Sequence, residues 1–404
     1  MKKPTYKTKP IYSIMRALVN FGLKIYYRRF QKVGYEDVPR DVPMFFAVNH
    51  QNAFMDALVA GGSTEGRQQP NYITRSDVFN PKTLKFLELW KMLPIYRQRD
   101  GADYVQKNEK MFAKFVDLLK SGDSLLIFPE GNHGRVRKLR VLRKGIGRIA
   151  FQAMDEMEDE DKDISIVPAG LNYSDHLKLR SEMLLIFGKP LHVKDYYQEH
   201  QENPRKALIS LRNDLAKAMQ DLIIHIRPQE YYETIEGIRT ISSDYLLENY
   251  PGNTIDQLHR FKAEKAMIDK VEAGLENGVI NGPELKEEVA AYFKGLTELK
   301  VRDHVVKKQP YNLAALLVKA IGLLIGLPGF LWGYVNHALV YHFSINTTRK
   351  MFKDDHFHSS VMFLMAFFLF PLAYLIQSGI VWALLDWRWA LGYLVTVPFF
   401  GNFA

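Results

Sequence analysis

An apolar run passes directly into polar residues in the stretch MFFAVNHQNAFMD, residues 44–56. The apolar part, Met44–Val48, predicts a buried strand, because short apolar runs bounded by turn residues are typical of parallel sheets. Asn52 suits the N-cap of a helix that begins at Ala53. His50 and Asp56 would then lie at the carboxyl end of a strand, where α/β sheets place their active sites.

The same alternation of strand and helix patterns extends from residue 35 to about residue 227, and it predicts an α/β fold. We expect a mixed, largely parallel sheet with flanking helices. The strand candidates are Met44–Val48, Tyr72–Thr74, Ser124–Phe128, Ile164–Val167 and Met183–Phe187. The helix candidates are Ala53–Ala60, Thr83–Lys91, Tyr104–Lys120, Lys144–Glu156 and Pro204–Ile226.

The C-terminal part has a different character, because it holds three long apolar stretches. Val361–Leu385 contains no charge and is long enough for a transmembrane helix, which needs about 20 residues. Leu313–Leu331 contains one charge, Lys319, and either spans the membrane or breaks at Gly326–Gly329 into a re-entrant hairpin. Trp389–Ala404 is the third stretch. Burial inside a soluble core is the alternative for all three.

The N-terminal segment Ile11–Tyr27 has the period of an amphipathic helix. One face carries apolar residues and the other carries Arg16 and Lys24. Such a helix either lies in a membrane interface or packs on the following domain, and both interpretations stay open here. We therefore expect an interface helix in residues 1–30 and an α/β domain in 31–227. A helical connector in 228–310 and a membrane region in 311–404 complete the prediction.

Charge and composition limit the function. The 404 residues include 54 Lys and Arg, 45 Asp and Glu and no cysteine, so the net charge is +9. The lack of cysteine excludes disulfides, thiolate metal sites and a cysteine nucleophile. A basic excess favours an anionic partner, such as nucleic acid, a membrane surface or a phosphorylated substrate.

A second polar stretch, FPEGNHG at residues 128–134, follows the predicted strand at Ser124. Its proline and glycines predict a tight turn that presents backbone N–H groups to an anion. Residues 135–148 then hold seven cations and no acid, among them Arg135 and Lys144. This cluster lacks interleaved aromatic residues, so it favours a phosphorylated small molecule over nucleic acid.

Two further segments complete the set of candidates. Arg97 follows a short strand-like segment and is able to bind a phosphate through two N–H groups. Pro168 follows the strand candidate Ile164–Val167 and would shape an apolar wall. His50 alone favours a structural histidine, since a histidine six residues before an aspartate is a weak signal. A metal held by His50, Asp56, Glu130 and His133 is the less favoured alternative, and we expect no metal.

In this order, the blocks NH-x5-D, IYR, FPEG and VP resemble the glycerolipid acyltransferases of the lysophosphatidic-acid and glycerol-3-phosphate type. The resemblance covers about residues 30–225. It implies that His50 is the base and that Asp56 is its partner. It implies that Arg97 and the Glu130–Gly131 turn bind the acceptor phosphate and that Pro168 lines the site. With Asn49 beside His50 and the cations Arg135 and Lys144, these residues make up the predicted substrate site. The five residues between His50 and Asp56, and the Asn132-His133 pair after FPEG, are similar to a subgroup that includes fungal glycerol-phosphate and dihydroxyacetone-phosphate acyltransferases.

The resemblance implies transfer of a fatty acyl group from acyl-CoA or acyl carrier protein to a hydroxyl of glycerol 3-phosphate or its 1-acyl derivative. No cofactor other than this acyl donor is expected, and membrane lipids are the expected partners. We expect an integral membrane protein whose catalytic domain faces the cytoplasm, because cations flank the first apolar stretch at Lys307 and Lys308. A lysophospholipid remodelling transacylase and a non-catalytic lipid-binding protein are the alternatives.

Overall fold

The protein is described by a computed structural model that covers residues 9–40, 42–66, 68–81, 84–134, 136–158, 162–249, 256–307 and 312–401. The chain forms two compact units that divide after Gly282. The first unit is built around a mixed sheet, and the second is helical.

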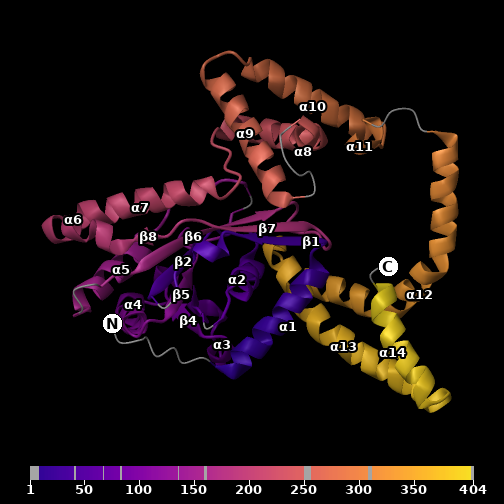
Figure 1. Cartoon of the computed structure of the whole chain (residues 1–404), viewed down its shortest axis with the longest axis horizontal. Helices are drawn as coiled ribbons and strands as arrows, with labels where there is room; N and C mark the ends of the chain where they lie inside the picture. Colours follow the sequence, from indigo (N-terminus) through magenta and orange to yellow (C-terminus); the bar gives the residue numbers. More distant parts are fainter. Residues whose placement is uncertain are drawn as a thin grey trace. The chain divides into compact units, whose positions relative to one another are not determined.

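The sheet has eight strands in the described part of the chain, in the order β1-β7-β6-β2-β5-β3-β4, with β8 beside β6 (Figure 1). Pairing is parallel except between β6 and its neighbours β7 and β8, so the predicted mixed, largely parallel sheet is confirmed. The strands are β1 (Arg29–Val33), β2 (Met44–Val48), β3 (Asn71–Arg75), β4 (Met92–Ile95), β5 (Ser124–Ile127), β6 (Ser165–Tyr173), β7 (Glu182–Phe187) and β8 (Leu191–His192).

Helices line this sheet, and β2 and β5 lie in its middle with every residue buried. Burial on both faces explains the continuous apolar run in β2. The helices of the first unit are α1 (Pro10–Tyr26), α2 (Ala53–Gly62), α3 (Leu84–Leu89), α4 (Tyr104–Lys120), α5 (Gly145–Glu156), α6 (Tyr197–Glu202), α7 (Pro204–Asp221), α8 (Tyr232–Asn249) and α9 (Gln257–Glu276).

Two clusters of buried side chains hold the first unit together. The larger one joins the middle strands to α4, α5 and α7, with Phe45, Phe115 and Leu211 among its members. The smaller one joins β7 to α8 and α9, and it includes Leu184, Ile235 and Phe261. The smaller cluster attaches the helices that follow residue 228 to the edge of the sheet.

Helix α1 packs on α2 and buries four side chains: Tyr12, Val19, Leu23 and Tyr26. Its polar residues Arg16 and Asn20 donate hydrogen bonds to backbone carbonyls of the domain, at 2.8 Å to Gln68 and 2.7 Å to Gly62. Four large side chains of the predicted apolar face are 47–61% exposed, namely Ile11, Ile14, Leu18 and Ile25, and Phe21 beside them is 65% exposed.

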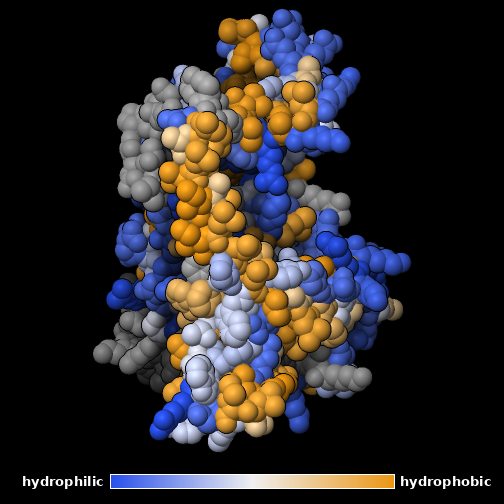
Figure 2. All heavy atoms as spheres, turned by 90° about the vertical axis from the view of Figure 1, so that its right-hand side faces the viewer, coloured by the Kyte–Doolittle hydropathy of each residue, from blue (hydrophilic) through white to orange (hydrophobic). Residues whose placement is uncertain are grey.

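The second unit begins at the second residue of α10 (Gly282–Glu298) and also contains α11 (Asp303–Val306), α12 (Leu313–Met351), α13 (His358–Leu384) and α14 (Trp387–Gly401). By length and composition, α12 and a segment from Asp355 to Leu384 that includes α13 are apolar enough to cross a membrane. Hydrophobic side chains gather along α12, as the space-filling view in Figure 2 shows, and most of its large apolar side chains are exposed. The hairpin considered at Gly326–Gly329 is wrong, because α12 continues through Pro328.

Candidate functional site

His50 and Asp56 meet at the carboxyl end of β2. Nδ1 of His50 lies 2.8 Å from Oδ2 of Asp56, and the Asp56 carboxylate is fully buried while the His50 side chain is 16% exposed. A carboxylate at Nδ1 makes that nitrogen the one that carries the proton, so Nε2 is left to accept a proton from another group. The pair thus has the geometry of a general base and its orienting acid.

A strained turn brings the two residues together. Ala53 begins α2 with a φ of +39°, a value that residues other than glycine rarely adopt. The Asn52 side chain makes no capping hydrogen bond and instead donates to the carbonyl of His176 at 2.8 Å. Oδ2 of Asp56 accepts hydrogen bonds from the backbone N–H groups of Gln51 and Asn52, both at 2.7 Å. These two N–H groups lie just before α2, so the carboxylate of Asp56, in the first turn of the helix, binds the segment that leads from His50 into α2.

The imidazole of His50 is held by two rings from the FPEG segment. The ring of Phe128 stacks on it with centroids 4.1 Å apart, and the ring of His133 meets it edge-on at 5.6 Å. The backbone N–H of Gly134 donates to the carbonyl of His50 at 3.0 Å. The second predicted block is therefore in contact with the first, as expected for parallel strands that end at the same edge.

Glu130 joins these two loops through its carboxylate. It is 5% exposed, and its two oxygens accept hydrogen bonds from the backbone N–H groups of His50 at 2.8 Å and Arg140 at 2.9 Å. Burial raises the pKa of Glu130 above its ordinary value, although the two N–H donors oppose this. Because both oxygens are occupied, the structure places Glu130 as a brace behind His50 and gives its carboxylate no open face for a phosphate.

Two predicted substrate residues are buried in the framework of the sheet. Asn49 is 1% exposed, and its amide exchanges hydrogen bonds with the backbone of Leu171, at 3.2 Å and 2.7 Å. Pro168 pairs with Ala47 inside β6, and its carbonyl accepts from Gly188 N–H at 2.8 Å. The prediction that a strand ends before Pro168 is wrong, because β6 continues to Tyr173. Both residues align strands here, and neither presents its side chain at an open surface.

The predicted cationic residues are spread along the same edge of the sheet. Arg97 follows the edge strand β4 and forms ion pairs with Asp77 at 2.8 Å and Asp100 at 3.2 Å. Since neighbouring strands lie about 4.8 Å apart, the end of β4 is about 14 Å from that of β2. Gly131 takes a φ of +76° in an exposed turn, and Lys144 is exposed where α5 begins. Arg135 lies outside the described residues.

Tyr173 is the residue of this site that the sequence did not reveal. Its hydroxyl donates a hydrogen bond of 2.6 Å to Oδ1 of Asp56, and its side chain is buried. Burial raises the pKa of Tyr173 well above its ordinary value, so the phenol stays protonated and its O–H donates the hydrogen bond to Asp56. The sequence did not place Tyr173 in a strand, because proline and glycine are unfavourable inside strands and β6 contains both Pro168 and Gly170.

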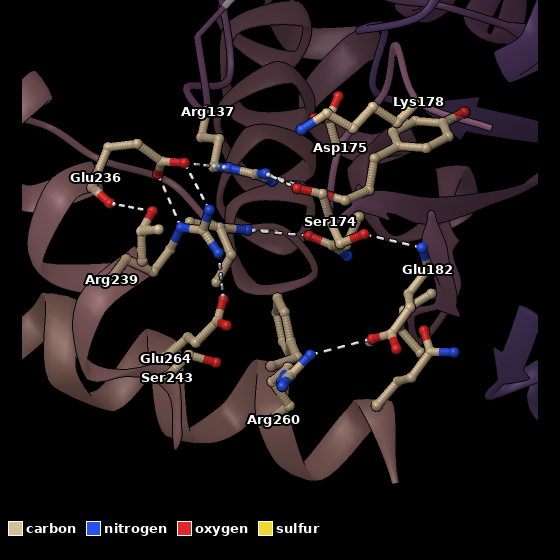
Figure 3. A pocket seen from close by; sticks show the side chains of 17 residues that line it. Arg137, Ser174, Asp175, Lys178, Glu182, Glu236, Arg239, Ser243, Arg260 and Glu264 are labelled. Atoms are coloured by element: carbon tan, nitrogen blue, oxygen red, sulfur yellow. Dashed lines mark hydrogen bonds and ion pairs between the residues drawn. The ribbon is translucent and has the colours of Figure 1, made fainter. Parts of the chain in front are cut away.

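Two pockets adjoin this site on the side of α8. The smaller one, of about 220 Å³, is lined by Gln51, which neighbours His50, and by Tyr173, Ser174 and His176, with Arg137 and Glu236. The larger one, of about 480 Å³, lies between the β6–β7 connection and helices α8 and α9 (Figure 3). Five residues line both pockets: Arg137, Tyr173, Ser174, Asp175 and Glu236.

The part of the chain that contains these residues is similar to known acyltransferases. Residues 29–172 match the family model described as Acyltransferase. The chain is 25% identical over 232 residues to Glycerol-3-phosphate O-acyltransferase 1 of Saccharomyces cerevisiae, which is 55% of this chain and 29% of that protein. It is 22% identical over 205 residues to an uncharacterized acyltransferase of Schizosaccharomyces pombe, covering 50% of this chain and 29% of that one. The chain thus spans less than a third of the length of these relatives.

Among solved structures, the chain is similar to the 1-acyl-sn-glycerophosphate (LPA) acyltransferase of Thermotoga maritima. The TM-score is 0.37 with 16% sequence identity, over 52% of this chain and 79% of that one.

Proposed function

We propose that this chain, whose residues 29–172 match the Acyltransferase family model, transfers a fatty acyl group from an acyl thioester to a glycerol-phosphate acceptor. The acceptor would be glycerol 3-phosphate or its 1-acyl derivative. The observation that carries the proposal is the contact between His50 Nδ1 and Asp56 Oδ2, which leaves Nε2 as a base at the edge of the sheet.

The chemistry follows from that arrangement. Nε2 of His50 takes the proton from an acceptor hydroxyl as its oxygen attacks the thioester carbonyl. Asp56 stabilises the imidazolium that forms, through the hydrogen bond at Nδ1. When the tetrahedral intermediate collapses, the C–S bond breaks and the thiolate leaves, taking the proton from His50. The products are an ester and a free thiol, so the step needs neither an oxidant nor a metal for its balance.

The acceptor phosphate would be bound by the cationic segment that follows the FPEG turn. The turn at Gly131 has a positive φ, and a side chain at this position would meet Arg143, whose atoms lie 3.3 Å from the ideal Cβ position. This close approach places the exposed side chain of Arg143 beside the turn and next to the exposed Lys144. The guanidinium of Arg97 already pairs with Asp77 and Asp100, so Arg97 would bind the phosphate in addition to these two carboxylates.

The membrane contacts would come from both ends of the chain. The exposed apolar face of α1 suits the boundary between lipid headgroups and acyl chains, since its polar residues are already bonded to the domain. Helices α12 and α13 would span the bilayer, and the cationic residues near Lys307 would keep the catalytic domain on the cytoplasmic side. A site at the interface would receive lipid substrates directly from the membrane.

The test is an acyl-transfer assay on membranes that contain the full chain. The wild type and His50→Ala are each assayed with labelled acyl-CoA or with acyl carrier protein that bears a labelled acyl group. Glycerol 3-phosphate and lysophosphatidate are offered separately as acceptors. We expect transfer to one acceptor and a loss of at least about 1,000-fold in the variant, since removal of a general base with its partner interaction has effects of this order. Transfer that survives in His50→Ala, or occurs only from a phospholipid donor, would overturn the proposal.

A further inference from the structure

The Asp56 carboxylate is supported from two sides by different parts of the chain. Its Oδ2 is bound by His50 and by the backbone N–H groups of Gln51 and Asn52, just before α2. Its Oδ1 accepts the hydroxyl of Tyr173 at 2.6 Å, which is the short distance typical of an O–H donor bonded to a carboxylate. Tyr173 lies at the end of β6, so its backbone position decides how this carboxylate is turned.

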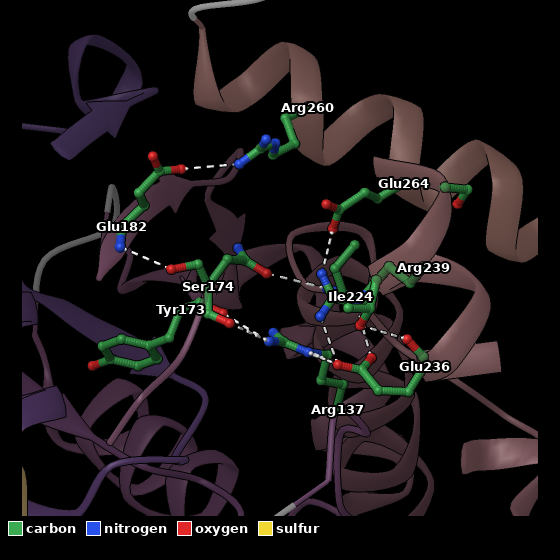
Figure 4. Close-up of polar contacts among 12 residues, drawn as sticks. Arg137, Tyr173, Ser174, Glu182, Ile224, Glu236, Arg239, Arg260 and Glu264 are labelled. Atoms are coloured by element: carbon green, nitrogen blue, oxygen red, sulfur yellow. Dashed lines mark hydrogen bonds and ion pairs between the residues drawn. The ribbon is translucent and has the colours of Figure 1, made fainter. Parts of the chain in front are cut away.

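The backbone of Tyr173 is in turn held by Arg137. Nη2 of Arg137 donates to the carbonyls of Tyr173 at 2.8 Å and Ser174 at 3.3 Å. Nε of the same guanidinium donates to Glu236 on α8 at 3.1 Å (Figure 4). The backbone N–H of Arg137 also donates to the hydroxyl of Tyr232, at the start of α8, at 2.9 Å. Helix α8 therefore fixes Arg137 at both its backbone and its side chain.

The carboxylate of Glu236 is firmly charged. It accepts two hydrogen bonds from Arg239, at 2.6 Å and 2.8 Å, beside the one from Arg137. Burial opposes ionisation of Glu236, but the hydrogen bond from Arg239 and the two arginine charges hold its pKa below its ordinary value. A charged acceptor at this position strengthens its hydrogen bond with Arg137.

The cations of the larger pocket are engaged in the same way. Arg239 pairs with Glu264 at 3.0 Å, Arg260 with Glu182 at 3.1 Å, and Lys178 with Asp175 at 2.8 Å (Figure 3). Four cations and four acids therefore line this pocket, and each cation has an acidic neighbour. Such balanced walls suit a rigid connection between α8, α9 and the sheet better than a site for an anion.

We propose that Tyr173 is a positioning residue for the His50–Asp56 pair, and that the Arg137–Glu236 contact connects its position to helices α8 and α9. This inference rests on the proposed acyl transfer. It assigns a role to the helical segment after residue 228, which carries no catalytic motif of its own. Tyr173 acts through Asp56 and does not touch the reacting atoms.

The principal test is Tyr173→Phe in the full-length protein, assayed for acyl transfer in membranes. This change removes one hydroxyl and keeps the ring. Hydrogen bonds to a charged group are worth about 10- to 100-fold in an equilibrium, so we expect kcat to fall by about that factor. The KM for the acyl thioester should stay within about twofold, since Tyr173 does not bind substrate.

Tyr196→Phe is the matched control. Tyr196 also donates its hydroxyl to an aspartate, Asp214, at 2.8 Å, but this pair joins the segment before α6 to α7. We expect its kcat to match the wild type. A loss of kcat in Tyr196→Phe equal to that in Tyr173→Phe would overturn the inference, because it would show a general effect on the fold.

Glu236→Gln tests the connection from α8, and it decides the question if Tyr173→Phe does not fold. The change removes the charge that holds Arg137, and we expect kcat to fall about three- to tenfold with an unchanged thioester KM. In the Tyr173→Phe background the same change should have no further effect, because both act on one contact. Full activity in Glu236→Gln, or additive losses in the double variant, would overturn the inference.

His50→Ala, measured beside these variants, separates the two proposals. If it is inactive while Tyr173→Phe and Glu236→Gln match the wild type, the positioning role is wrong and the acyl transfer stands. If it retains full activity, the proposed function itself is wrong.

Discussion

Glu130→Gln removes one of the two acceptors that hold the FPEG segment against His50. In the wild type, the carboxylate receives the N–H groups of His50 and Arg140 at 2.8 Å and 2.9 Å. A glutamine has one acceptor oxygen, so either orientation of its amide sets an NH₂ group against a backbone N–H. One of these part-buried N–H groups then loses its partner at the buried Glu130 position.

The cost follows from that geometry. A buried donor left without an acceptor destabilises the folded state by about 1–3 kcal/mol. Because one of the two donors is the backbone of His50 itself, part of this strain would displace the imidazole. A misplacement of about 1 Å at a catalytic group lowers the rate by about 100-fold. We therefore expect both a lower melting temperature and a kcat reduced by about 10- to 100-fold, with the KM for the acceptor little changed.

The assay measures thermal unfolding in detergent and acyl-transfer kinetics over a range of acceptor concentrations. Glu272→Gln is the control, since Glu272 is buried in α9 and its two oxygens accept the backbone N–H of Arg227 at 2.7 Å and the Nε–H of the same arginine. It should lower the melting temperature in a similar way and leave kcat unchanged. A Glu130→Gln variant with unaltered stability and kcat but a much higher acceptor KM would refute the bracing role and restore Glu130 as a phosphate contact.

Two further changes test the fold around this site. Burial, aided by the charge of Lys138, lowers the pKa of His225 from its ordinary 6.5 to about 4, and its Nδ1 accepts the N–H of Leu139 at 2.9 Å. Above pH 6.5, His225 is neutral in both the folded and the unfolded protein. Between pH 6.5 and 4 it binds a proton only in the unfolded protein, so the free energy of unfolding decreases as the pH falls. After allowance for solvent screening the loss is about 1–2 kcal/mol. His225→Asn keeps a hydrogen-bond acceptor but does not titrate in this range, so its free energy of unfolding should change less between pH 7 and pH 5 than that of the wild type. An equal change in both proteins would contradict the role given to His225. Gly170→Ala should destabilise the sheet by at least about 1–3 kcal/mol, because a Cβ there would lie 2.1 Å from the carbonyl oxygen of Leu222. Gly145→Ala, which meets no atom within 4 Å, is its control in the same unfolding assay, and equal stability of the two variants would show that β6 adjusts.

Several elements were predictable because local pattern and tertiary burial agree. The apolar run of β2 and the periodic helix α4 have the predicted bounds, Met44–Val48 and Tyr104–Lys120. The proximity of His50 and Asp56 was also predictable, since a strand that leads directly into a helix leaves few ways to arrange the residues between them. Strand β1 was not predicted, because its sequence RFQKV is polar and its residues are only partly buried.

The sequence by itself determined the α/β pattern, the order of the acyltransferase motifs and the apolar character of the C-terminal helices. These properties depend on residue type and spacing along the chain. Only the tertiary structure decided which side chains serve the site. In the folded chain, Glu130 and Asn49 accept hydrogen bonds from backbone N–H groups, and β6 continues past Pro168. Tyr173 contacts Asp56, although 117 positions separate them in the sequence. Hydrogen-bond partners of buried polar groups are set by which strands lie side by side, and a single sequence does not contain that information in any local pattern.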